Sequence, residues 1–215
     1  MQRYTFYIHF PTPPTEKRTR PATNVSFPTI GTPFAVVLLK KIITNKNDKT
    51  MKKTIVVYGS TTGTCQEVAE QIAQKLGVSD VKNISDVDAD MLADYDNLIL
   101  GTSTWGAGEL QDDWYDGVEM LKGADLSGKT IALFGVGDAE GYSDTFCGGM
   151  ASLYDAVKDS GARLIGQVDA STYTYDDSES VVDGKFVGLA IDSSESEGKT
   201  ENRVDAWLDG IKGEL

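Results

Sequence analysis

The sequence is short of the side chains on which many enzymes depend. Its one histidine, His9, lies near the N-terminus, so residues 51–215 contain no His-based triad, His general base or His metal ligand. Its two cysteines, Cys65 and Cys147, lie 82 positions apart without a CxxC pair, which favours neither a disulfide framework nor a zinc or iron–sulfur site. Chemistry in residues 51–215 must therefore use backbone groups, hydroxyls, carboxylates or a borrowed cofactor.

Proline is absent after Pro33, and before Met51 glycine occurs only at Gly31. Charge changes at the same place, because residues 1–50 carry 8 Lys/Arg and 2 acids, whereas residues 51–215 carry 12 and 31, a net charge of −19. Three statistics that change together predict a basic extension over residues 1–50 and one domain over residues 51–215. A domain of that charge repels nucleic acid and anionic membranes, so we expect its partners to be basic.

The extension offers few indications of its own. Its apolar run at residues 34–39 is too short to span a membrane and lies too far from the N-terminus for an ordinary signal peptide. The basic composition is compatible with an organelle targeting peptide, although residues 51–53 lead directly into an apolar strand, which favours a natural start at Met51. We expect residues 1–50 to be disordered or not part of the native protein, and the protein to be cytoplasmic.

The domain alternates apolar runs with amphipathic segments. Short runs typical of strands covered on both faces predict five strands, at residues 53–58, 78–84, 98–102, 129–136 and 163–168. Apolar residues at helical spacing predict helices that contain residues 68–76, 114–121, 150–157 and 204–211. This alternation predicts an α/β fold with a doubly wound parallel sheet. Such sheets bind ligands beyond the carboxyl ends of their strands, so the loops after strands one, three and four are the candidate site.

The loop after the first strand predicts a phosphate site. Its sequence, Gly-Ser-Thr-Thr-Gly-Thr-Cys over residues 59–65, brings four hydroxyls and two glycines to a helix N-terminus, where unpaired N–H groups favour an anion. The spacing matches neither a Walker A nor a GxGxxG motif. Because no Lys or Arg lies between Lys53 and Lys75, neutral donors would hold the anion. The alternative is that these hydroxyls only cap the helix.

An aromatic residue stands in each of the other two loops. Trp105 lies among small residues in the loop that follows the third strand, and Tyr142 lies among glycines and polar residues after the fourth. An ordinary buried loop tryptophan is the alternative for Trp105. Two aromatic platforms beside a phosphate loop predict a planar, phosphorylated aromatic ligand, and this geometry suits flavin mononucleotide (FMN).

Residues 51–215 resemble flavodoxin across their whole length, and specifically its long-chain type. Residues 60–65 resemble the family's phosphate loop, Ser/Thr-x-Thr-Gly-x-Thr, with Cys65 in place of its last threonine, so that hydroxyl is lost and the backbone N–H remains. Residues 104–106 resemble the loop whose tryptophan lies on the inner side of the flavin, and residues 137–142 resemble the loop whose tyrosine stacks on the outer side. Residues 171–185 resemble the insertion that defines long-chain members.

The resemblance implies non-covalently bound FMN and a five-stranded sheet of order 2-1-3-4-5 with helices on both faces. It implies these cofactor-binding residues: Ser60, Thr61, Thr62, Gly63, Thr64, Cys65, Ser103, Thr104, Trp105, Gly106, Gly137, Asp138, Tyr142, Thr145 and Cys147.

The implied function is low-potential one-electron transport by a monomer that is not an enzyme. Its expected partners are basic-faced redox proteins, namely ferredoxin/flavodoxin-type reductases and acceptors. An FMN-dependent NAD(P)H or quinone reductase would share the fold but should have a basic or amide-lined pocket for its second substrate, and the flavin loops are almost free of Lys and Arg. A receiver-type signalling module would share the strand order but needs acidic residues at the ends of strands one and three. In this sequence those ends are Tyr-Gly-Ser and Gly-Thr-Ser, which argues against this alternative.

Overall fold

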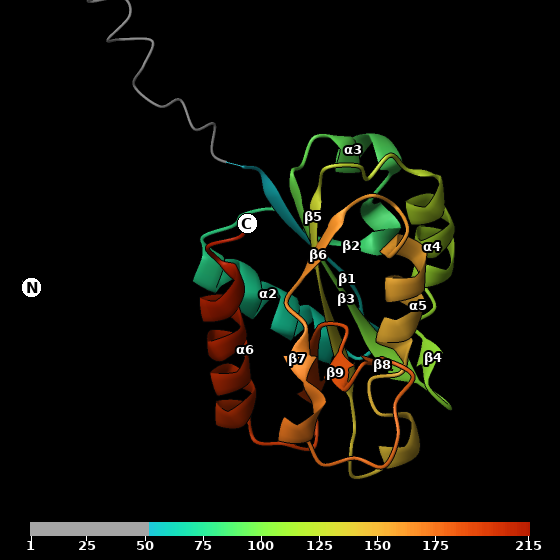
Figure 1. Cartoon of the computed structure of the whole chain (residues 1–215), viewed down its shortest axis with the longest axis vertical. Coiled ribbons are helices and arrows are strands. Elements are labelled where there is room, and N and C mark those ends of the chain that lie inside the picture. Colours follow the sequence, from blue (N-terminus) through green and yellow to red (C-terminus); the bar gives the residue numbers. More distant parts are fainter. Residues whose placement is uncertain (1–51) are drawn as a thin grey trace, which may run out of the picture. The chain divides into compact units, whose positions relative to one another are not determined.

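The computed structural model describes residues 52–215, so the extension expected over residues 1–50 lies outside the described residues. A parallel sheet forms the centre of the domain (Figure 1). In spatial order its five main strands are β10 (Leu189–Asp192), β5 (Thr130–Gly137), β3 (Asn97–Trp105), β1 (Thr54–Gly59) and β2 (Val81–Asn83). This arrangement confirms the expected order 2-1-3-4-5, since β5 and β10 are the fourth and fifth of these strands along the chain.

Side chains on the central strands alternate between two buried clusters. On β1, Ile55 and Val57 belong to one cluster and Val56 to the other, and all three have no exposed surface. The same alternation holds on β3, where Leu98 and Ile99 belong to different clusters. Both faces of the sheet are therefore covered, which is why these strands appear in the sequence as continuous apolar runs.

Helices cover each face of the sheet (Figure 1). α2 (Thr64–Leu76) and α6 (Glu197–Ile211) pack on one face, and α3 (Ala89–Ala93), α4 (Trp114–Gly123) and α5 (Gly149–Val157) contribute to the other cluster. The short helix α3 was not expected from the sequence, which has too few apolar positions there to show a helical period. Within residues 52–215, none of the helices is long and apolar enough to cross a bilayer.

The register of the strands brings three loops to one edge. Gly59 of β1 pairs with Thr102 of β3, and Thr102 pairs with Gly135 of β5. The strands run parallel, and β3 and β5 continue beyond this level to Trp105 and Gly137, so the three segments meet at the carboxyl ends of the strands. The candidate site predicted from the sequence thus lies at one end of the sheet.

The fifth strand differs from the expected continuous segment at residues 163–168. It is split into β6 (Arg163–Ile165), which pairs with the first half of β5, and β10, which pairs with the second half. Between them Gly166 has φ +83°, and a Cβ there would lie 2.7 Å from Nε1 of Trp207, which donates a hydrogen bond to the Gly166 carbonyl. The chain turns out of the sheet at this glycine because the left-handed conformation cannot continue a strand.

The segment between β6 and β10 contains residues 171–185, the insertion that the sequence predicted, and we use the name insertion for the whole segment. It forms a small antiparallel sheet of order β7-β9-β8 and a 3-10 turn. Its strands are β7 (Val168–Asp169), β8 (Val181–Val182) and β9 (Lys185–Phe186). The strand-like character expected around residues 186–190 therefore belongs to two strands, β9 and β10.

A paired arginine joins the insertion to α6. Nε and Nη2 of Arg203 each donate to the Glu195 carboxylate at 2.8 Å, and the guanidinium lies 4.0 Å from the ring centroid of Tyr173. The Tyr173 hydroxyl donates to the Ala190 carbonyl at 2.9 Å, and burial raises the pKa of this phenol to about 12. Hydrogen bonds from Arg203 lower the pKa of Glu195 to about 2, so the carboxylate stays ionised until the pH falls close to that value.

Glu195→Gln is expected to lower the free energy of unfolding at pH 7 by about 1–2 kcal/mol, because it weakens a hydrogen-bonded charge pair. A carboxyl whose folded pKa is depressed stabilises the fold above its unfolded pKa, near 4.5, and this contribution is lost as pH falls towards about 2. The gap between wild type and variant in urea unfolding should therefore shrink from pH 4.5 to pH 2. Glu197→Gln, an exposed acid two residues further along the chain, is the control; a gap independent of pH would contradict the assignment.

Candidate functional site

A cavity of about 210 Å³ lies where the loops after β1, β3 and β5 meet. Ten of the residues predicted to bind the cofactor line it, namely Thr62, Thr64, Ser103, Thr104, Trp105, Gly106, Gly137, Asp138, Tyr142 and Thr145. Val136 and Ser193 also line the cavity and were not predicted. The structure thus gathers residues from four separate segments into one site.

The loop after β1 divides its hydroxyls between two roles. Ser60 Oγ accepts a hydrogen bond from the Gly63 N–H at 3.1 Å, and Thr61 Oγ1 accepts one from Gln111 Nε2 at 3.3 Å. These bonds hold the loop, while Thr62 and Thr64 line the cavity. The N-cap of α2 is Gly63, with φ +101° and no side-chain cap, so helix capping does not account for the four hydroxyls. The first N–H groups of a helix have no intrahelical acceptor, and here they adjoin the cavity.

The buried side chain of Gln111 is hydrogen-bonded to this loop, a role that the sequence did not predict. Its side chain is 2% exposed, and Oε1 accepts from the Asp113 N–H at 3.0 Å while Nε2 bonds Thr61. A Cβ on Gly59 would collide with Gln111 Oε1 and with the Trp114 ring. Glycine at position 59 therefore lets the buried amide approach the loop.

Two exposed aromatic side chains flank the cavity. Trp105, at the end of β3, is 41% exposed, and Tyr142 is 61% exposed. The Trp105 indole N–H donates to Ser103 Oγ at 3.0 Å, which orients the ring. The alternative of an ordinary buried loop tryptophan is wrong for Trp105. Exposed rings of this kind beside a cavity offer flat apolar surfaces to a planar ligand.

The loop after β5 is held by two carboxylates. Asp138 Oδ1 accepts from the N–H groups of Glu140 and Gly141, at 3.0 and 2.8 Å. Asp192, at the end of β10, accepts from the Ala139 N–H at 3.1 Å. The next residue, Ser193, donates its N–H to the Gly137 carbonyl at 2.8 Å, and this contact brings Ser193 to the cavity. The signal for Ser193 was the strand-like sequence just before it, whose carboxyl end belongs to the same edge of the sheet.

Five predicted residues do not line the cavity: Ser60, Thr61, Gly63, Cys65 and Cys147. Both thiols are fully buried, and burial raises the pKa of each above that of an ordinary cysteine. Cys147 Sγ lies within hydrogen-bond range of the Gly135 and Ile191 carbonyls, at 3.5 and 3.7 Å. Neither thiol lines the cavity, so any contribution of these two residues to ligand binding comes from their backbone.

The cavity is poor in charge. Of the described residues that line it, Asp138 alone is charged, and no Lys or Arg is among them. An anion at the α2 N-terminus would thus meet hydroxyl and N–H groups only. This agrees with the neutral donors expected from the sequence.

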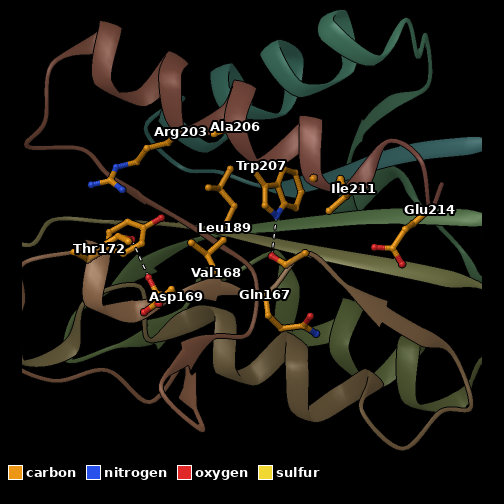
Figure 2. Close-up of a pocket in the computed structure, with 13 residues that line it drawn as sticks. Gln167, Val168, Asp169, Thr172, Leu189, Arg203, Ala206, Trp207, Ile211 and Glu214 are labelled. Carbon is orange, nitrogen blue, oxygen red and sulfur yellow. Dashed lines mark hydrogen bonds between the residues drawn. The ribbon is translucent and has the colours of Figure 1, made fainter.

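A second cavity, of about 570 Å³, lies between α6 and the start of the insertion (Figure 2). Trp207, Leu189 and Ile211 form its buried surface. Among residues 52–215, the one cation that lines it is Arg203, which is paired with Glu195. It is larger than the loop cavity, but it includes none of the predicted site residues. We therefore assign the site to the smaller cavity.

Comparison with known proteins agrees with this geometry. The model of the flavodoxin family matches residues 56–207. The chain belongs to the flavodoxin family. It is similar to flavodoxin 1 of Azotobacter vinelandii, with 41% identity over 171 residues that cover 77% of this chain and 98% of the relative. A flavodoxin of Picosynechococcus is 39% identical over 165 residues, 75% of this chain and 97% of the relative.

A solved structure supports the same assignment. The fold is similar to that of Fusobacterium nucleatum flavodoxin bound to flavin mononucleotide, with a TM-score of 0.71, 30% identity and coverage of 77% of this chain and 99% of that one. The insertion between β6 and β10 agrees with the long-chain type of flavodoxin. Membership of the family implies other redox proteins as partners.

Proposed function

We propose that this flavodoxin is a low-potential one-electron carrier that binds FMN without a covalent bond. The observation that carries the proposal is the cavity at the aligned ends of β1, β3 and β5, with Trp105 and Tyr142 exposed beside it and a loop of neutral donors at the α2 N-terminus. Each part of FMN has a matching surface there. The protein transfers electrons and does not turn over a substrate of its own.

The phosphate fits the first loop. Thr62 and Thr64 offer hydroxyls, and the free N–H groups of the α2 N-terminus offer further donors together with the helix dipole. Ser60, Thr61 and Gly63 shape this loop through the hydrogen bonds described above, and the Cys65 N–H belongs to the first turn of α2.

Trp105 and Tyr142 would hold the ring between them, and the backbone near Asp138, Thr145 and Cys147 would bind its polar edge. FMN supplies the one-electron chemistry when bound, and the protein supplies orientation and electrostatics. Trp105 and Tyr142 would exclude water from the ring faces, which would disfavour added negative charge on a ligand between them. The net charge of −19 over residues 51–215 acts in the same direction. Both effects favour a low potential.

The reductase alternative is not favoured by the lining. A second, phosphorylated or quinone substrate would need cations or amides beside the ring, and within the described residues the cavity has one charged group, the acid Asp138. We propose a monomeric, cytoplasmic carrier whose partners are ferredoxin/flavodoxin-type reductases and acceptors with basic faces. Two free, buried thiols suit a reducing compartment.

Stepwise reduction of the purified, FMN-loaded chain tests the function. A carrier should pass through two separate one-electron steps, visible as a distinct long-wavelength absorption between the oxidised and fully reduced spectra. Direct two-electron bleaching would favour the reductase. A chain that retains no FMN once free flavin is removed would exclude both.

Electron transfer to a basic partner is expected to slow with salt. Acids in the loops and helix beside the cavity would steer the partner: Asp112, Asp113, Asp116, Glu119, Asp138, Glu140 and Asp144. The alternative is that they only keep the surface solvated. Because the Debye length falls to about 10 Å at 0.1 M salt, stopped-flow association rates should fall roughly tenfold between low and high ionic strength.

The matched variants for this prediction are Asp112→Asn with Asp116→Asn, against Asp159→Asn. The first pair lies beside the loop after β3. Asp159 is an exposed acid between α5 and β6, at the end of the sheet where the strands begin. The pair should flatten the salt dependence and the Asp159 variant should not. Rates that do not respond to salt would leave the acids a role in solubility only.

Gly106→Ala is expected to draw the two one-electron potentials of the loaded protein together. In the resembling family the peptide after the loop tryptophan reorients on reduction, and Gly106 here has φ +51°. A Cβ would resist that conformation and would also collide with the Glu109 carboxylate. About 1 kcal/mol of strain confined to one redox state would change its population severalfold in a spectroelectrochemical titration.

Glu109→Gln with Gly106 retained is the control, because it keeps the side-chain shape and leaves the backbone of residue 106 free. An equal loss of FMN affinity in every redox state of Gly106→Ala, with the gap between potentials unchanged, would show that Gly106 only makes a turn.

A further inference from the structure

The insertion is bonded directly to the loop that carries Tyr142 and Thr145. The N–H groups of Asp176 and Asp177 both donate to the Ser143 carbonyl at 3.0 Å, and the Phe146 N–H donates to the Asp177 carbonyl at 3.3 Å. Phe146 is 1% exposed and packs against aromatic rings of the insertion, with a centroid distance of 5.7 Å to Phe186. Residues 143–148, which follow Tyr142, are therefore held by the insertion.

Two buried serines of the insertion hold the centre of this segment. Ser178 Oγ donates to the Phe146 carbonyl at 2.5 Å, and Ser180 Oγ donates to the Cys147 carbonyl at 2.7 Å. Ser178 is 7% exposed and Ser180 is fully buried. Each hydroxyl therefore holds one of the two peptide groups that flank Cys147.

Cys147 has a backbone conformation that needs such support. Its φ is +53°, one of two positive values among the described non-glycine residues. A Cβ disfavours this left-handed region, so a cysteine stays there only where its surroundings hold it. Two held peptide groups, one on each side, fix the φ and ψ angles of the residue between them.

The geometry of the peptide group then determines where the Cys147 N–H points. In a trans peptide the C=O and the following N–H point in opposite directions. Ser178 draws the Phe146 carbonyl towards the insertion, so the Cys147 N–H points away from it, towards Gly137. A Cβ on Gly137, which lines the cavity, would lie 2.7 Å from Cys147 N. Within residues 52–215 this N–H has no hydrogen-bond acceptor.

We propose that Ser178 and Ser180 are positioning residues, which hold Cys147 in its left-handed conformation and so present its N–H to the ring edge of the flavin. The recognised chemistry is a carbonyl-type acceptor on that ring. This inference rests on the proposed function, because it assigns part of the insertion to the flavin site. A merely structural role would tie the insertion to the domain without affecting the ring.

The test compares Ser178→Ala and Ser180→Ala with Ser171→Ala in the full chain. Ser171 is the matched control because it also lies in the insertion, but its hydroxyl bonds only the local Asp169 carboxylate, at 2.7 Å. Dissociation constants are measured for FMN and for riboflavin, which keeps the ring and lacks the phosphate. Melting temperatures of the flavin-free variants report the structural contribution separately.

We expect each serine variant to bind both flavins about 3- to 10-fold more weakly, as for the loss of one hydrogen bond, and by the same factor for each. The double variant should lose less than the product of the two factors, because both serines act on one residue. In wild type the Cys147 amide resonance should move downfield when flavin binds, and this shift should be smaller in Ser178→Ala. Ser171→Ala should match wild type.

Three results would overturn the inference. Serine variants that melt lower but bind flavin as wild type does would show a structural role only. Weaker binding of FMN with riboflavin unaffected would place the effect at the phosphate loop. A wild-type chain that binds neither flavin would overturn the proposed function as well, and this outcome is distinct from the other two.

Discussion

The in-register pairing of three buried parallel strands, β1, β3 and β5, is the constraint on which the rest of the molecule depends. Their side chains alternate between two core clusters, so a slip of one residue would move every side chain into the wrong cluster. The register is therefore tightly specified by burial. It places Gly59, Thr102 and Gly135 side by side, and the segments that line the cavity lie at or just beyond these positions. The site is a consequence of how the core packs.

The electrostatics of the site follow from what surrounds these loops. The α2 N-terminus offers an anion N–H groups, hydroxyls and the helix dipole, so binding does not need a neutralising cation. The charge of a bound phosphate then remains in the field of an already acidic domain. The features proposed to bind the cofactor would thus also oppose addition of further negative charge to it, which is the property that a low-potential carrier requires.

The insertion shows how a long segment can be added without disturbing this arrangement. It leaves the sheet at Gly166 and returns at β10, so β5 keeps a parallel neighbour along most of its length. Buried serines and aromatic rings of the insertion contact Phe146 and Cys147, in the segment that follows β5. A loop that carries an exposed ring needs such support, because few of its own side chains are buried. The expectation that residues 1–50 form a separate extension stays a prediction.

The sequence by itself determined the order of strands and helices, the three loops and the aromatic side chains within them. These features depend on hydrophobic periodicity and on turn residues, which can be read from residues close together in the chain. Ten of the residues implied by the resemblance to flavodoxin line one cavity. Only the tertiary structure decided the split of the fifth strand, the arrival of Ser193, and the bond from Gln111 to Thr61. It also decided that both thiols face the core. Contacts between residues far apart in the chain depend on which segments pack side by side, and local sequence patterns do not determine this packing.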